Sequence, residues 1–285
     1  MKENIFWTRV GFLGIFLLCF PACSRHELPF RLDSQNLSWG EIQMEKMVRD
    51  RPAMAKYAQK GDEVWNWTVR QFAGEWEKGG IEWDPADPVP LWDARYYGAQ
   101  GNRKAYVQVT ALSAMKNFHF GKPKDGPELW YDLVFEFCNF QEMEKSREIT
   151  RLADAGKIGE EDYCFRKTFL EAVDTRRAVH RFFADLWVPN CSRLTLDPWG
   201  EFMKMANNVG IPVWTAGQFV DKYFNVDYYR LPERNASAED YYFHHQFYKK
   251  QYEEDVVPML LNNQIPVPTP IDFLDLKKKM AAEIR

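Results

Sequence analysis

KAYVQVTAL at residues 104–112 and PELWYDLVFEFCNF at residues 127–140 are the two stretches that decide the fold. The first alternates apolar with other side chains, which predicts a β-strand whose inner face carries Val107, Val109 and Ala111. The second follows Asp125, a residue type that caps helices, and predicts a helix from Pro127 to about Ala155. Its expected buried residues are Trp130, Leu133, Val134, Phe137 and Phe140.

Outward from this pair, the apolar periodicity predicts mostly helices. They are expected at about 38–50, 62–78, 159–187, 198–208, 215–224, 237–262 and 274–284. Residues 84–102 contain three prolines and predict an irregular surface loop. The predicted class is therefore α+β and mainly α-helical: one compact domain with a small β-sheet packed against two long antiparallel helices.

The composition indicates a folded protein that is not specialised for nucleic acid. The chain of 285 residues is 46% apolar and 16% aromatic, which is enough apolar surface to offset the entropy of ordering. Its formal net charge is −4, whereas phosphate binding needs a concentrated basic face. We therefore expect no nucleic-acid partner.

The N-terminus has the pattern of a secretory signal. A net positive start is followed by the uncharged run VGFLGIFLLCFPA at residues 10–22. As a helix this run spans about 20 Å, less than the ~30 Å hydrocarbon core of a bilayer. A short apolar run behind a basic start is typical of a signal peptide, which we assign to residues 1–22.

Residues 20–24 read FPACS and resemble the lipobox of bacterial lipoproteins, in which a small residue precedes a cysteine. Phe20 stands where leucine is commonest, and Pro21 is unusual beside it. The resemblance implies that Cys23 is acylated and becomes the first residue of the mature chain, with membrane lipid as its partner. The alternative is an ordinary secretory signal or an uncleaved anchor in which Cys23 is incidental.

The same resemblance gives a location and a domain plan. Ser24 after the cysteine favours the outer membrane, so we expect a lipid-anchored protein of the cell envelope that faces the periplasm. Residues 23–37 would form the lipidated tether and residues 38–262 a single globular domain. Residues 263–285 would add a Pro-rich extension and a basic terminal helix.

The sequence lacks the usual signatures of cofactor and metal sites. Apart from Cys23, the mature chain has only Cys138, Cys164 and Cys191, which excludes a disulfide scaffold. No CxxC or Cys/His cluster is present, and neither a P-loop, a GxGxxG nor a GxSxG motif occurs. We expect no cofactor and no metal.

The order of a strand and then a buried helix that carries a Glu resembles the core of zincin-type metallopeptidases, over residues 104–187. In that family the helix carries His-Glu-x-x-His, with the Glu as general base. Here Phe135 stands at the first His position, Glu136 at the Glu and Asn139 at the second His. The resemblance implies a related fold whose zinc site has been lost, in which Glu136 and Asn139 bind a peptide amine or another polar ligand.

Two of these candidate features have structural alternatives. A charge among apolar residues is usually paired, so Glu136 is also explained by an ion pair with Arg or Lys of an adjacent helix. Trp92 and Tyr96 lie in an aromatic loop suited to binding peptide or sugar, and core burial explains them equally well. In the aromatic run 241–248 we expect Phe243 and Phe247 to pack inward.

Two functions from different classes follow. The first is a non-enzymatic binding or scaffold lipoprotein of the cell envelope, with an envelope protein or peptide as partner. It would bind through a cleft between the strand at 104–112 and the helix at 127–155. The second is a hydrolase of zincin-like fold with a degenerate or unusual metal site, in which Glu136 is the candidate general base.

Overall fold

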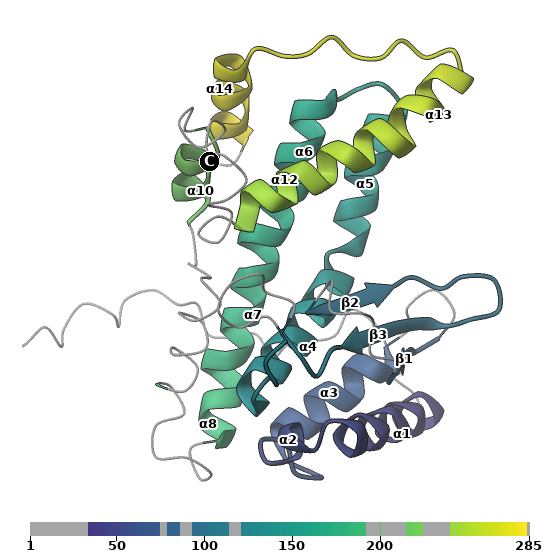
Figure 1. The fold of residues 1–285 in the computed structure, drawn as a ribbon, viewed down its shortest axis with the longest axis vertical. Helices are drawn as coiled ribbons and strands as arrows, with labels where there is room; N and C mark the ends of the chain where they lie inside the picture. Colours follow the sequence, from purple (N-terminus) through teal and green to yellow (C-terminus); the bar gives the residue numbers. More distant parts are fainter. Residues whose placement is uncertain are drawn as a thin grey trace, which may run out of the picture. The chain divides into compact units, whose positions relative to one another are not determined.

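The computed structural model describes residues 34–74, 79–85, 93–113, 121–191, 200, 215–224 and 240–283 (Figure 1). The chain divides into two compact units at residues 31 and 32, and all of the described residues belong to the second unit. The predicted signal peptide, Cys23 and Trp92 lie outside the described residues, as does nearly all of the predicted helix 198–208. No helix within the described ranges combines the length and apolar character that a bilayer crossing requires.

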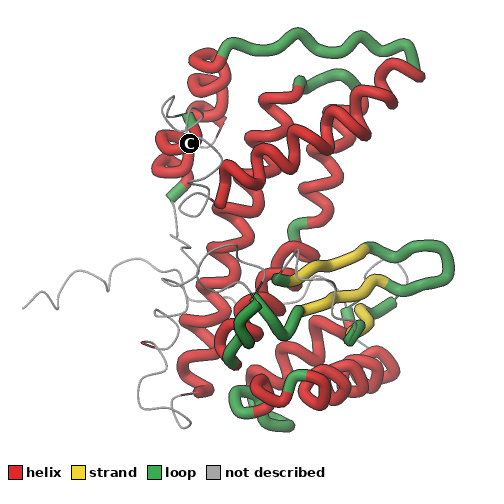
Figure 2. The backbone as a smooth tube through the Cα atoms, in the orientation of Figure 1, coloured by secondary structure: helices red, strands yellow, loops and turns green. Residues whose placement is uncertain are grey.

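The described part is mainly helical, which confirms the predicted class (Figure 2). The first helices are α1 (Ser34–Asp50), α2 (Pro52–Ala55), α3 (Glu63–Ala73), α4 (Gly126–Gln141), α5 (Met143–Asp154) and α6 (Glu160–Phe169). They are followed by the π-helical η1 (Leu170–Thr175), α7 (Arg176–Phe182), the π-helical η2 (Phe183–Trp187) and α8 (Val188–Cys191). The remaining helices are α10 (Ala216–Tyr223), α12 (Asp240–Gln251), the π-helical η4 (Tyr252–Val256), α13 (Val257–Asn262) and α14 (Phe273–Glu283).

A small mixed sheet accompanies the helices. Its strands β1 (Ile81–Trp83), β2 (Ala94–Tyr97) and β3 (Ala105–Val109) lie in the order β1-β3-β2. β1 is parallel to β3 and β2 is antiparallel to it, so that Tyr96 lies opposite Val107. The predicted strand is β3. The expectation of an irregular segment at 84–102 was wrong for β2, which pairs only because β3 reaches it from further along the chain.

Of the two long helices that we predicted, the first is divided into two in the structure and the second is continuous. Within 127–155 the helix ends at Gln141 and α5 begins at Met143, because the backbone N–H of Glu142 is shared between the carbonyls of Cys138 and Asn139. The second predicted helix runs through α6, η1, α7, η2 and α8 in one course, seen as the long teal helix of Figure 1. A short turn through Gly156 joins α5 to α6.

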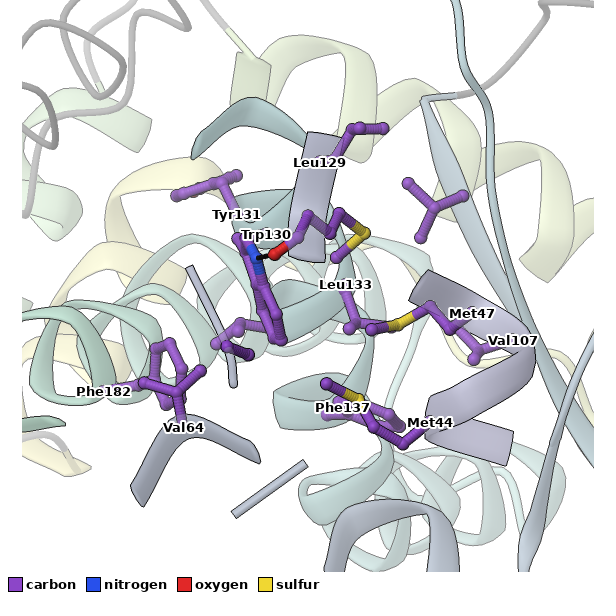
Figure 3. Close-up of a cluster of buried hydrophobic side chains, with 14 of the residues drawn as sticks. Met44, Met47, Val64, Val107, Leu129, Trp130, Tyr131, Leu133, Phe137 and Phe182 are labelled. Atoms are coloured by element: carbon purple, nitrogen blue, oxygen red, sulfur yellow. Dashed lines mark hydrogen bonds between the residues drawn. The ribbon is translucent and has the colours of Figure 1, made fainter. Parts of the chain in front are cut away.

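The largest hydrophobic core lies between α1, α3, α4, the sheet and the C-terminal part of the long helix, formed by α7, η2 and α8. Figure 3 shows Leu133 and Phe137 of α4 among Met44 and Met47 of α1. The indole N–H of Trp130 donates to the carbonyl of Met54 at 3.0 Å. The five α4 residues predicted to be buried are all buried, and they are Trp130, Leu133, Val134, Phe137 and Phe140.

Two smaller cores lie along the N-terminal part of the long helix, formed by α6 and η1. One joins α6 and η1 to α10 and α14, and its members include Phe165, Val173, Phe219 and Leu276. The other joins α5 and α6 to α12 and α13, through Tyr163, Tyr248 and Leu260 among others. The prediction that Phe247 packs inward was wrong: this side chain is 45% exposed, and its neighbours His245 and Tyr248 face the interior instead.

Candidate functional site

Helix α4 places one polar stripe inside an otherwise apolar environment. The helix begins with a capping box, in which the Asp125 side chain accepts from the backbone N–H of Glu128 and the Glu128 side chain accepts in return. The stripe consists of Asp132, Glu136 and Asn139, which are four and three residues apart and therefore share one face. Glu136 and Asn139 are buried, so the stripe must find its partners within the protein.

Asp132 finds a cationic partner. The buried ammonium of Lys124 lies 2.6 Å from Asp132 Oδ2 and 3.0 Å from Asp93 Oδ1, and it also donates to the carbonyl of Asp93. Burial raises the pKa of Asp132 to about 6, and the charge of Lys124 opposes this rise. This end of the stripe is a satisfied ion-pair network that ties α4 to the residue before β2.

Glu136, one turn further along, has a different environment. Its side chain is 7% exposed, and among the described residues no Lys, Arg or His forms an ion pair with it. Burial raises the pKa of Glu136 to about 8, and the neighbouring charge of Glu171 adds to the rise. Hydrogen bonds from the Asn139 side chain and the Tyr96 backbone oppose it. The Glu136 carboxyl is therefore mostly protonated at neutral pH.

Glu171 comes from the π-helical segment η1 and brings a second carboxylate to the same place. The hydroxyl of Tyr248, on α12, donates to Glu171 Oε1 at 2.5 Å. Burial and the charge of Glu171 hold the pKa of Tyr248 well above its ordinary value. Burial also raises the pKa of Tyr96, on β2, and the charges of Glu136 and Glu171 add to it. The charge of Glu171 therefore acts on Glu136, Tyr96 and Tyr248 alike.

We call Tyr96, Glu136, Asn139, Glu171 and Tyr248 the carboxylate cluster. Its members come from β2, α4, η1 and α12, so four segments must fold together to build it. The ring of Tyr96 also packs on Phe140 with centroids 4.7 Å apart, so this residue serves the core as well as the cluster.

The buried lysine on the long helix, Lys167, forms its hydrogen bonds with α5. Lys167 directs its ammonium to α5, where it donates to the carbonyl of Ser146 at 2.9 Å and to Ser146 Oγ at 2.6 Å. Burial lowers the pKa of Lys167 to about 8, although the charge of Glu171 opposes the change. The lysine therefore links α5 to α6, and within the described residues it forms no ion pair with Glu136.

The structure brings three of the predicted site residues together, namely Tyr96, Glu136 and Asn139. The ion pair with Arg or Lys that we considered for Glu136 is absent from the described residues. Sequence reasoning missed Glu171 and Tyr248. The available signal for Glu171 was a single charge between Leu170 and Ala172, both of which are buried.

Within the described ranges, no group of three or more His, Cys, Asp or Glu side chains is placed to hold a metal ion. No protein-family model, curated protein or solved structure matches this chain. The arrangement of the cluster therefore has to be interpreted from its own chemistry. Two neighbouring carboxyl groups, an amide and two phenols offer several hydrogen-bond acceptors and favour a positively charged occupant.

Proposed function

We propose that this protein is a lipid-anchored lipoprotein of the bacterial cell envelope that binds a cationic ligand without chemical turnover. The folded part would hold the ammonium group of a peptide or another envelope component at Glu136. Acylation of Cys23, an outer-membrane position facing the periplasm and the antiparallel pairing of 127–155 with 159–187 belong to the same proposal. The lipobox-like sequence supports the anchor, and the carboxylate cluster supports the ligand.

One observation supports ligand binding: the buried carboxyl group of Glu136 lies near Glu171, and no described Lys, Arg or His forms an ion pair with Glu136. An ionised carboxylate is costly to bury unless a positive charge or hydrogen bonds compensate it. At neutral pH Glu136 meets this cost by holding a proton, as its pKa of about 8 indicates. An arriving ammonium group would replace that proton and supply the missing positive charge.

A primary ammonium group suits the cluster because it has three donors. Glu171 and, once it has given up its proton, Glu136 provide carboxylate acceptors from two helical segments. Hydrogen bonds between an ammonium and carboxylates are roughly twice as strong as those between neutral groups. A quaternary ammonium has no N–H donor and should bind much more weakly.

The test uses alanyl-alanine amide, which carries an ammonium but no carboxylate, and titration calorimetry at pH 7, below the pKa of about 8 of an α-amino group. We expect Glu136→Gln to weaken binding at least tenfold, and N-acetylation of the probe to do the same. Glu144→Gln is the matched control, because Glu144 is an exposed glutamate on α5. Equal binding by wild type and Glu136→Gln would exclude the proposed site.

A second function is favoured by a specific observation. A carboxyl group with a pKa of about 8 suits general acid–base catalysis near neutral pH, and the zincin-like order of strand and helix assigns that role to Glu136. We propose a hydrolase as the alternative. Stoichiometric zinc in the purified protein, together with cleavage of fluorogenic peptides that Glu136→Gln abolishes, would favour it over ligand binding.

A further inference from the structure

Two lysines of the described part of the chain are buried, and their partners differ in kind. Lys124 lies 2.6 Å from Asp132 Oδ2 and 3.0 Å from Asp93 Oδ1, so two carboxylates balance its charge. Lys167, on α6, forms no ion pair within the described ranges, and its hydrogen bonds go to uncharged groups. A buried ammonium without a counter-charge loses its proton more readily, which is the usual way in which a lysine becomes a base.

The side-chain partner of Lys167 is a serine. Lys167 Nζ lies 2.6 Å from Ser146 Oγ, across the contact between α6 and α5. The lysine is 5% exposed, whereas Ser146 is only half-buried and can be reached from solvent. A hydroxyl within hydrogen-bond distance of a base is the basic unit of nucleophilic catalysis, and lysine serves as the base in one class of such pairs.

The hydrogen bonds around Ser146 leave its hydroxyl dependent on the lysine. The carbonyl of Ser146 accepts from Lys167 Nζ at 2.9 Å and also from Thr150 Oγ1 at 3.2 Å, so this carbonyl has a second donor. Ser146 Oγ bonds to Lys167 alone among the described residues. When the lysine is neutral, the hydroxyl of Ser146 can therefore donate its proton to Nζ.

The surroundings of Lys167 hold its amine in place and set its charge. Nζ lies 5.4 Å from the centre of the Tyr163 ring, one turn earlier on α6. The negative charges that act on the lysine are those of Glu171, one turn later on the long helix, and Asp154 on α5. Burial outweighs both and lowers the pKa of Lys167 to about 8. Part of the lysine is therefore neutral near pH 7.

We propose that Ser146 and Lys167 form a nucleophile–base pair that accepts an acyl group from an activated ester. Ser146 Oγ attacks the ester carbonyl carbon while Nζ takes the hydroxyl proton; the alcohol then leaves with that proton, and Ser146 keeps the acyl group as an ester. Water hydrolyses this ester with Lys167 again as base, which releases the acid and restores the serine. The reaction is separate from ligand binding at Glu136 and does not depend on it.

The experiment treats the full chain with p-nitrophenyl acetate and locates the acetyl group by peptide mass mapping. Acetyl esters on serine are removed by hydroxylamine, whereas acetyl amides on lysine are not, so the two products are distinguishable. We expect a hydroxylamine-sensitive acetyl group on Ser146. Its rate of formation should rise with pH and level off above about pH 8, because the neutral form of Lys167 is the base.

Three variants test the role of each residue. Ser146→Ala should abolish the labelling. Lys167→Arg keeps a cation that donates hydrogen bonds but is no base near pH 8, so it should slow labelling of Ser146 about a hundredfold. Lys60→Arg is the matched control, because Lys60 is an exposed lysine that pairs with Glu45, and it should react as the wild type does. Ser38, an exposed serine on α1, should stay unlabelled.

Several outcomes would overturn this inference. An unlabelled Ser146 in the wild type refutes it without any variant, and so does an acetyl group that forms on Lys167 instead. Labelling of Ser38 as fast as that of Ser146, or an unchanged rate in Lys167→Arg, would show that the lysine does not activate the serine. None of these results bears on the binding of alanyl-alanine amide at Glu136, which calorimetry measures independently.

Discussion

The pH dependence of folding offers a direct test of the environment of Glu136. Its pKa is about 8 in the folded protein, whereas the ordinary value is 4.5. Between these two pH values the folded chain keeps a proton that the unfolded chain has lost, so the free energy of unfolding falls as the pH rises. The stabilisation is complete below pH 4.5 and is lost as the pH passes 8.

The magnitude follows from the difference between the two pKa values. At 1.36 kcal/mol per pH unit, the interval from 4.5 to 8 corresponds to about 5 kcal/mol as an upper limit. Glutamine resembles the protonated carboxyl and does not titrate. Glu136→Gln should therefore match the wild type within about 1 kcal/mol at pH 5 and be more stable by about 3–5 kcal/mol at pH 9.

Guanidinium unfolding at pH 5, 6, 7, 8 and 9, followed by tryptophan fluorescence, measures this difference. The difference between the unfolding free energies of the two proteins at each pH removes the contributions of titrating groups that both contain. Such groups are Asp132, whose pKa is about 6, and Lys167, whose pKa is about 8. Glu144→Gln should follow the wild type throughout. If Glu136→Gln keeps the wild-type slope between pH 5 and pH 8, the carboxyl is ionised in the folded protein and our account of the cluster fails.

Three further predictions concern packing and attachment. Lys124→Met should lower the free energy of unfolding by about 3–5 kcal/mol in the same assay, because it leaves Asp132, whose side chain is only 15% exposed, without its cation. Gly40→Ala should lower the thermal midpoint, since the added Cβ would lie 2.2 Å from the carbonyl oxygen of Val69 and force α1 away from α3; an unchanged midpoint would contradict this packing. Cys23→Ala should move the protein from the membrane fraction to the soluble fraction, and its retention in membranes would refute lipid anchoring.

Local sequence signals predicted the helical segments that hold the site. Asp125, which the sequence indicated as a helix cap, caps α4 within a capping box. The apolar stripe of α4 identified its buried face. It also drew attention to Glu136, because this charged residue lies among apolar ones. These signals act within a few residues, so a single sequence is enough to detect them.

The missed features depend on contacts between distant segments. Glu171 and Tyr248 follow Glu136 by 35 and 112 residues, and nothing in their own neighbourhoods shows that they meet it. The same holds for β2, a four-residue strand in a Pro-rich region that exists because β3 pairs with it. The end of α4 is a further example, since residues 141–143 contain neither Gly nor Pro.

The long helix from Glu160 to Cys191 supplies side chains to all three hydrophobic cores. Tyr163 belongs to the core with α12, Phe165 and Val173 to the core with α14, and Phe183 to the largest core. A truncated version of the protein that divides this helix would therefore strip apolar contacts from every core at once. Shortened variants for biophysical work should be cut on either side of this helix, and the three cores should melt in one cooperative transition.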